Sequence, residues 1–169
     1  MQIAKRFRRW RHSRGFGIHS PFAFRFVCEV LNPSRAYGFY AYEELEAMRR
    51  RLRVRSISRR RLRMLFRVVL ELRPATVCIV ANEPLADLLR FVVAKAAPAA
   101  QVVDHCADLL ICASAQVCHD ATHAVFLDIA NGALDAFAGR AYGHLYRNPD
   151  IAIYVGHRHL PRQTFEVKF

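Results

Sequence analysis

The sequence feature that most constrains this fold is an alternation of short apolar runs and amphipathic stretches in the second half, residues 74–169. The run Thr76–Val80 is short, continuous and apolar, which is typical of a strand buried on both faces of a parallel sheet. Residues 84–96 follow with leucines and valines at helical spacing, and Pro98 ends that pattern. This alternation predicts an α/β domain with a mostly parallel sheet.

Further strands are predicted over residues 101–104, 109–112 and 124–128, and a helix is predicted over residues 133–146. Residues 151–155 and 164–169 are expected to close the sheet as an antiparallel pair. One connection is short, because only His105, Cys106 and Ala107 separate Asp104 from Asp108. A parallel crossover needs about a dozen residues. Either a strand–helix unit is missing, or residues 106–117 are helical, and the sequence leaves both interpretations open.

The first half, residues 1–73, is predicted to be helical. Ser20 followed by Pro21 is a favourable helix start, and Ser58 is an equally plausible N-cap further along the chain. Helices are expected over residues 22–31, 42–53 and 58–72. The predicted fold class is therefore a reduced Rossmann-like α/β domain over residues 74–169, preceded by a basic helical N-terminal region over residues 1–73.

The positive charge of the chain is concentrated in this first region. Residues 1–73 hold 19 Lys/Arg and five Asp/Glu, whereas the remaining residues carry a net charge of −2. The side chains that we expect to contact nucleic acid combine phosphate-binding cations with an aromatic ring for stacking: Arg8, Arg9, Trp10, Arg11, Arg60 and Arg63. Three other interpretations of residues 1–67 stay open, namely a solvated helix face, a surface for a protein partner, and an amphipathic arm on an anionic membrane.

Composition also indicates where in the cell the protein is expected. No apolar run reaches the ~20 residues that span a bilayer, so no transmembrane segment is expected, and the basic N-terminus lacks the pattern of a secretory signal. The five cysteines mostly lie in apolar runs, which favours reduced, buried thiols and a cytoplasmic location. The Cys and His residues between 106 and 123 lack the tight C-x2-C spacing of structural zinc sites, so no metal site is expected.

The string Gly15-Phe16-Gly17-Ile18-His19-Ser20-Pro21-Phe22 resembles the HGIHSPF-type opening of a bacterial family of class I S-adenosylmethionine (SAM)-dependent methyltransferases. The tract 42–52, the helix before Pro74, the run 125–129 and the ending 163–169 are similar to later landmarks of that family, in the same order. The resemblance implies a Rossmann-like fold, SAM as cofactor and methyl transfer as the activity. Because the second half is short, we expect fewer than the family's usual seven strands.

The cofactor region departs from the family pattern. A class I methyltransferase follows its first strand with an acid and a glycine-rich turn, which lets the backbone approach the ligand. Here Val80-Ala81-Asn82-Glu83-Pro84 contains no glycine. The resemblance places Asn82 and Glu83 near the methionyl group and Asp104 on the ribose hydroxyls.

Two residues are candidates for catalysis, namely His19 inside the opening motif and Asp128, which survives from an Asp-Asp-Ile motif of the family. A structural role at a helix start is the alternative for His19, and helix capping is preferred for Ser20. The sequence therefore predicts a degenerate methyltransferase-like protein without efficient SAM binding, whose cofactor is SAM if it is active and otherwise none. The alternative is a non-catalytic nucleic-acid- or protein-binding module that uses the basic region.

Overall fold

The computed structural model describes residues 15, 17–33, 41–113, 120–129, 134, 137 and 139–168. Its helical segments are α2 (Pro21–Arg25), the π-helix η1 (Phe26–Leu31), α3 (Ala41–Arg51), α4 (Arg59–Leu72) and α5 (Leu85–Ala96). Its strands are β1 (Thr76–Val80), β2 (Gln101–Val102), β3 (Ala107–Cys112), β4 (Ala121–Phe126), β5 (His144–Arg147), β6 (Ala152–Val155) and β7 (Gln163–Glu166). None of the helices in these ranges combines the length and the apolar character that crossing a membrane requires.

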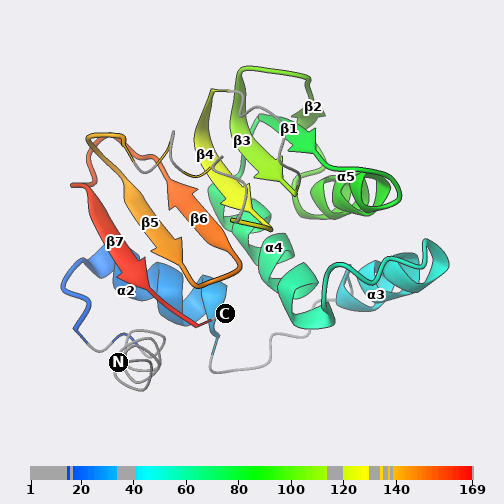
Figure 1. Ribbon diagram of the computed structural model, residues 1–169, viewed down its shortest axis with the longest axis horizontal. Coiled ribbons are helices and arrows are strands. Elements are labelled where there is room, and N and C mark those ends of the chain that lie inside the picture. Colours follow the sequence, from blue (N-terminus) through cyan, green and yellow to red (C-terminus); the bar gives the residue numbers. More distant parts are fainter. Residues whose placement is uncertain are drawn as a thin grey trace.

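The strands form one mixed sheet in the order β2-β1-β3-β4-β6-β5-β7 (Figure 1). Four of the six pairings within the described residues are parallel, and the two pairings of β6 are antiparallel. The predicted α/β fold, Rossmann-like with a mostly parallel sheet and an antiparallel hairpin, is confirmed. The expectation of fewer than seven strands is wrong, because seven lie within the described residues.

The connection between the second and third strands can be short because β2 is small. This strand holds only two residues, and both β2 and β3 pair with β1, on its two opposite sides. Residues 103–106 therefore pass beside β1 and do not need the length of a helical crossover. Of the two interpretations of residues 106–117, the helical one is wrong, because Ala107–Cys112 is strand β3; residues 114–119 lie outside the described residues.

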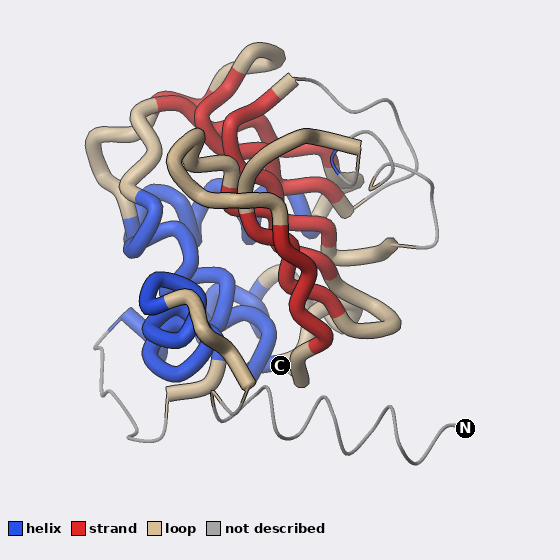
Figure 2. The backbone as a smooth tube through the Cα atoms, turned by 90° about the vertical axis from the view of Figure 1, so that its left-hand side faces the viewer, coloured by secondary structure: helices blue, strands red, loops and turns tan. Residues whose placement is uncertain are grey.

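The described helices lie together on one side of the strands (Figure 2). Helices α4 and α5 supply large apolar side chains to the main core, among them Leu62, Leu65 and Leu88, each at most 1 % exposed. They meet the apolar faces of the central strands there, including Leu109 and Val125. A smaller apolar cluster on the other side of the sheet contains Cys78, Leu110 and Phe126.

The predicted helix starts are confirmed in atomic detail. Ser20 Oγ accepts a hydrogen bond from the backbone N–H of Ala23 at 3.3 Å, and Ser58 Oγ accepts one from Arg61 N–H at the same distance. Each serine has extended backbone geometry, as an N-cap requires. The main core also runs across the expected boundary between residues 73 and 74, since α4 and the sheet share one buried cluster. The division into two regions stays a prediction.

The closing part of the sheet differs from the expected arrangement. The helix predicted over residues 133–146 is wrong at its end, because His144–Arg147 is strand β5. A strand buried on both faces is continuously apolar, and its pattern is hard to distinguish from that of a buried helix. The antiparallel hairpin is β5–β6, not β6–β7. Strand β6 inserts between β4 and β5, so both its edges are paired, and β7 adds parallel to the remaining edge of β5.

Candidate ligand pocket and arginine surface

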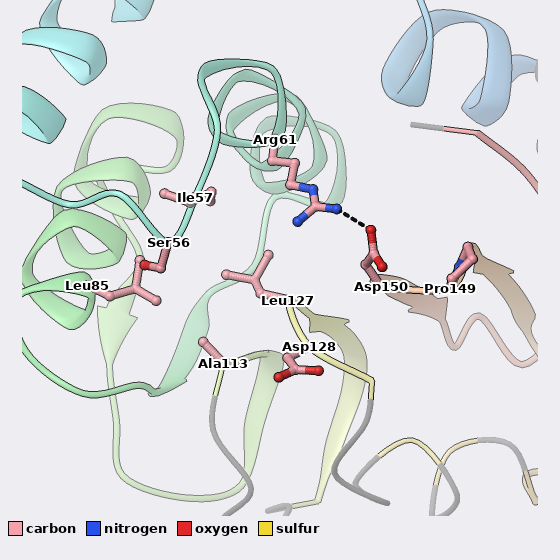
Figure 3. A pocket seen from close by; sticks show the side chains of 9 residues that line it. All are labelled: Ser56, Ile57, Arg61, Leu85, Ala113, Leu127, Asp128, Pro149 and Asp150. Atoms are coloured by element: carbon pink, nitrogen blue, oxygen red, sulfur yellow. Dashed lines mark hydrogen bonds and ion pairs between the residues drawn. The ribbon is translucent and has the colours of Figure 1, made fainter.

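A cavity of about 420 Å³ lies where the parallel strands β3, β4 and β5 end. Its lining combines apolar side chains with four polar ones, Ser56, Arg61, Asp128 and Asp150. In Figure 3, Ser56 and Leu85 lie on one side, Pro149 and Asp150 on the other, and Leu127 lies between Arg61 and Asp128. The order β2-β1-β3 places the topological switch point of the sheet between β1 and β3, and Leu85 and Ala113, which come after these two strands, line the cavity. Open α/β sheets bind ligands at such a point.

The floor of the cavity is held by the ends of the sheet ladders. The N–H of Ala113 donates to Val80 O at 2.8 Å, and the N–H of Leu127 donates to Cys112 O at 2.8 Å. Each bond extends a parallel pairing by one residue beyond the strand. Residues 113 and 127 are therefore fixed by backbone hydrogen bonds, and Asp128 follows directly on this rigid support.

The β5–β6 turn holds Asp150 beside Asp128. Asn148 Oδ1 accepts hydrogen bonds from the N–H groups of Asp150 and Ile151 at 2.8 and 2.9 Å, which is an Asx turn. The N–H of Ile129 donates to Asp150 O at 3.2 Å. The segment after β4 and the turn after β5 are thus tied together, and their two carboxylates line one cavity.

Arg61 is the positively charged residue among those that line the cavity. Its Nη2 donates to Asp150 Oδ2 at 2.6 Å, and its side chain is 31 % exposed. Figure 3 shows a second guanidinium nitrogen of Arg61 directed away from Asp150 and toward the side where Leu127 lies. Arg61 therefore bridges to one wall of the cavity and keeps further donor capacity.

The connection from α3 to α4 forms the rim. The N–H of Val54 donates to Arg49 O and the N–H of Arg53 donates to Arg50 O, the paired bonds of a Schellman helix end. Arg53 occupies the left-handed position of this motif at φ 55°, where glycine is usual. The connection continues into Ser56 and Ile57, which line the cavity.

A buried ion pair fixes this rim. The Arg49 guanidinium donates to both oxygens of Glu46 and also to Val54 O at 3.0 Å. The hydrogen bond from Arg49, with a second from Arg50, lowers the pKa of Glu46 to about 2 even though burial opposes that shift. The α3 end and the start of the connection are therefore clamped together over a wide range of pH.

Four arginines on this rim form what we call the arginine strip: Arg51, Arg53, Arg55 and Arg59. All four are exposed, and no side-chain hydrogen bond or ion pair joins their guanidinium groups to any residue in the described part of the chain. No Asp or Glu occurs between residues 47 and 70, a stretch that contains ten arginines. The strip therefore concentrates uncompensated positive charge next to the cavity.

The nucleic-acid-binding residues predicted from the sequence fall into two groups. Arg60 is exposed on α4 and donates to Asn32 Oδ1 at 3.0 Å. The guanidinium of Arg63 lies 4.9 Å from the ring centre of Tyr42, so that side chain packs against the protein. Arg8, Arg9, Trp10 and Arg11 lie outside the described residues.

The three predicted cofactor residues lie on two separate loops. Asn82 and Glu83 follow β1 and are exposed, and Glu83 accepts from the N–H of Asp87 at 3.1 Å and from Arg90 at 2.7 Å. Asp104 is also exposed, and its backbone oxygen accepts from Cys78 Sγ at 3.4 Å. None of the three lines the cavity.

SAM, which the family resemblance implies, does not fit a cradle made of these residues. The Glu83 carboxylate already caps the first turn of α5, where the N–H groups would otherwise face a ligand. Asp104 lies beside Cys78, two residues before β1 ends at Val80, and so does not reach the edge of the sheet. The structure brings Asp128 to the cavity and leaves Asn82, Glu83 and Asp104 apart from it; their assigned roles stay predictions.

The opening motif packs against the opposite edge of the sheet, where β4 and β5 begin. Gly15 has φ +80°, and a Cβ there would lie 2.2 Å from the Phe24 ring. The Phe22 ring lies 5.8 Å from His144 and 5.5 Å from His157. His19 itself is exposed. The motif is thus used to start α2 and dock it, while the catalytic role of His19 stays a prediction.

We call the group beneath this motif the histidine–aromatic cluster: Phe22, Phe26, His123, His144, Tyr146, His157 and Phe165. Burial lowers the pKa of His123 and of His144 to about 4, and the neighbouring His157 adds to both shifts. His123 Nδ1 accepts from Gly156 N–H at 3.1 Å, and His144 Nδ1 lies 3.2 Å from Tyr146 Oη. These histidines are therefore neutral core groups at pH 7.

No set of three or more His, Cys, Asp or Glu side chains in the described ranges is arranged to hold a metal ion. Cys118 and His119 of the sequence pattern lie outside those ranges. Cys78 and Cys112 are buried thiols, as predicted, whereas Cys106 is exposed.

Comparisons with protein-family models, with curated proteins and with solved structures found no significant match. The methyltransferase resemblance therefore stays an expectation from the sequence, and function has to be argued from the site. Sequence reasoning identified the arginine clusters and Asp128 but missed Ser56 and Asp150. The Asn148-Pro149-Asp150 turn signal was visible in the sequence, but nothing local indicated that this turn would meet the end of β4.

Proposed function

We propose that this protein is a degenerate methyltransferase-like protein, without efficient SAM binding, that binds single-stranded nucleic acid through the arginine strip. The observation that carries the proposal is the set of four exposed arginines without a described partner beside a cavity at the carboxyl edge of the sheet. Structural arginines are usually paired, as Arg49, Arg61 and Arg90 are here. Unpaired, clustered arginines favour an external polyanion.

The absence of a cofactor cradle at Asn82, Glu83 and Asp104 supports the non-catalytic part of the proposal. Calorimetric titration with SAM and with S-adenosylhomocysteine tests that part directly. We expect no heat of binding at micromolar ligand. Binding with a micromolar Kd would contradict the loss of cofactor binding.

Fluorescence anisotropy with a labelled 12-nucleotide uridine RNA tests nucleic-acid binding. Each neutralised phosphate on a single strand contributes about −0.7 to the slope of log K against log salt. Four contacts by the strip therefore predict roughly a 50-fold loss of affinity between 50 and 200 mM salt.

A charge-matched pair of double variants separates the strip from general electrostatic attraction. Arg55→Ala/Arg59→Ala removes two strip charges, and Arg73→Ala/Arg158→Ala removes two exposed charges elsewhere. We expect the first pair to weaken binding about tenfold and to reduce the salt slope by about 1.4, with less than a twofold change for the second. No RNA binding at 50 mM salt, or equal losses in both double variants, would contradict the proposal.

A further inference from the structure

The distribution of charge around the cavity separates an inner surface from a rim. Two carboxylates and one arginine line the inside, and that arginine is already paired with Asp150. The strip arginines, whose side chains have no partner among the described residues, adjoin Ser56 and Ile57 along the chain. A phosphate is therefore favoured on the rim and opposed inside, where carboxylate charge would repel it.

The inner surface instead suits a flat, uncharged ring with hydrogen-bond donors on its edge. Ile57, Leu85 and Leu127 supply apolar walls, and Asp128 and Asp150 supply acceptors. The cavity volume of about 420 Å³ is at the small end of the roughly 300–1,000 Å³ that is usual for ligand sites. Hydrogen bonds hold the backbone of both carboxylate-bearing segments, so the two aspartates are anchored at their backbone before a ligand arrives.

We propose that this cavity binds a guanine base of the nucleic acid whose phosphates lie on the arginine strip. This inference rests on the proposed function and deepens it by naming the base. Guanine carries adjacent N1–H and N2–H donors, which match the two oxygens of one carboxylate, and its O6 accepts a hydrogen bond from arginine. The carboxylate of Asp128 takes the two donors, Asp150 holds Arg61 in place through their ion pair, and the remaining donors of Arg61 reach O6. Recognition of unstacked bases on their Watson–Crick edge is the usual way in which proteins read single-stranded RNA.

The other bases fit this donor pattern less well. Adenine and cytosine each present a single amino group next to a bare ring acceptor, and uracil presents one N–H between two carbonyls. A bidentate contact to a carboxylate is therefore available to guanine alone. A good bidentate contact gives discrimination of at least fivefold against the wrong base.

The test compares a 12-nucleotide uridine RNA with the same RNA carrying one central guanosine, by anisotropy at 50 mM salt with the full chain. We expect the guanosine RNA to bind about tenfold more tightly. Asp128→Asn replaces carboxylate acceptors by an amide of the same shape, and we expect it to reduce the ratio of the two RNA affinities to less than twofold.

Two further variants give the experiment its controls. Asp150→Asn repeats the test on the second carboxylate, and thermal unfolding checks that each variant is folded. Asp120→Asn is the matched control, because Asp120 is an exposed carboxylate at the start of β4, paired with Arg140, whereas Asp128 follows the end of the same strand. We expect Asp120→Asn to keep the preference.

The outcomes distinguish this inference from the function on which it rests. Uridine RNA binding with no guanosine preference, or a preference that survives both Asp128→Asn and Asp150→Asn, overturns the base assignment and leaves the proposed function standing. A preference that is lost equally in Asp120→Asn overturns it as well, because the effect would then follow net charge. Failure of both RNAs to bind overturns the proposed function itself.

Discussion

The polar groups at the two ends of the central strands differ in burial and charge. At the edge where β3, β4 and β5 end, charged side chains stay exposed around a cavity, and the strip arginines have no described partner. At the edge where β4 and β5 begin, His123 and His144 are buried among aromatic rings and kept neutral. The first arrangement contributes little to stability and is suited to an external ligand, whereas the second is part of the core. In the structure the most distinctive motif of the chain starts and docks α2, whereas less distinctive residues line the candidate ligand pocket.

The largest expected effect tests the structural nature of the histidine–aromatic cluster. Phe26 is 0 % exposed, and its ring centre lies 4.9 Å from that of Tyr146. We expect Phe26→Ala to lower the free energy of unfolding by about 3–5 kcal/mol, because it leaves a cavity in the core. Urea unfolding measures this change. Phe24→Ala, at a ring that is 48 % exposed, is the control and should cost far less; equal losses would show that α2 is not docked as described.

A somewhat smaller effect per residue comes from pH. Below pH 6.5 the unfolded histidines take up protons, whereas folded His123 and His144 do not until pH falls to about 4. The contribution of these histidines to stability is therefore complete above pH 6.5 and is lost as the pH falls from 6.5 to 4, by about 3 kcal/mol for each of the two at about 1.4 kcal/mol per pKa unit. Glu46 stays ionised in this window because its pKa is about 2.

Urea unfolding at pH 7 and pH 4.5 measures the loss, and His144→Phe provides the sharper comparison. Phenylalanine keeps an aromatic ring in the cluster but cannot bind a proton, so the variant should lose less stability between the two pH values than the native protein. An unchanged pH dependence in His144→Phe would assign the acid sensitivity to other groups.

The smallest expected effect concerns the edge of the sheet that carries the cavity and the arginine strip. Arg53 and Arg73 both end helices in the left-handed region, at φ 55° and 46°. Glycine adopts this conformation without the steric cost that a side chain brings, so each Arg→Gly change should be neutral or stabilising by about 0.5–1 kcal/mol. Only Arg53→Gly should also weaken RNA binding, by several-fold, because Arg73 lies at the far end of α4 from the cavity. Loss of stability in Arg53→Gly would show that this arginine serves the fold.

Much of the fold could be predicted because its signals are local. Ser20 and Ser58 were recognised as N-caps because a serine before a helix start accepts a backbone N–H nearby in the chain. Strand β1 was recognised from five residues, Thr76–Val80, with no need of their partners. The errors occurred where pairing decides the structure, at β5 and β7, whose positions follow from the insertion of β6 between β4 and β5.

The candidate site was harder to predict, because its polar residues come from three distant stretches of chain. Asp128 was identified through a family resemblance, and the strip arginines through their density, but Asp150 meets them only by way of the β5–β6 turn. Arg61 and Asp150 are 89 residues apart in sequence. No rule based on periodicity or spacing predicts a contact between residues so far apart in the sequence.

Local signals in the sequence were enough to predict the helix starts, the buried central strands and the α/β class, and they located the concentration of arginine between residues 47 and 70. Three features became apparent only from the folded chain: the strand order, the docking of the opening motif on buried histidines, and the meeting of Arg61, Asp128 and Asp150 in one cavity. The physical reason is the range of the interactions involved. Caps, propensities and apolar periods act within a few residues, whereas a sheet places residues together through hydrogen bonds between segments that the chain order does not make neighbours.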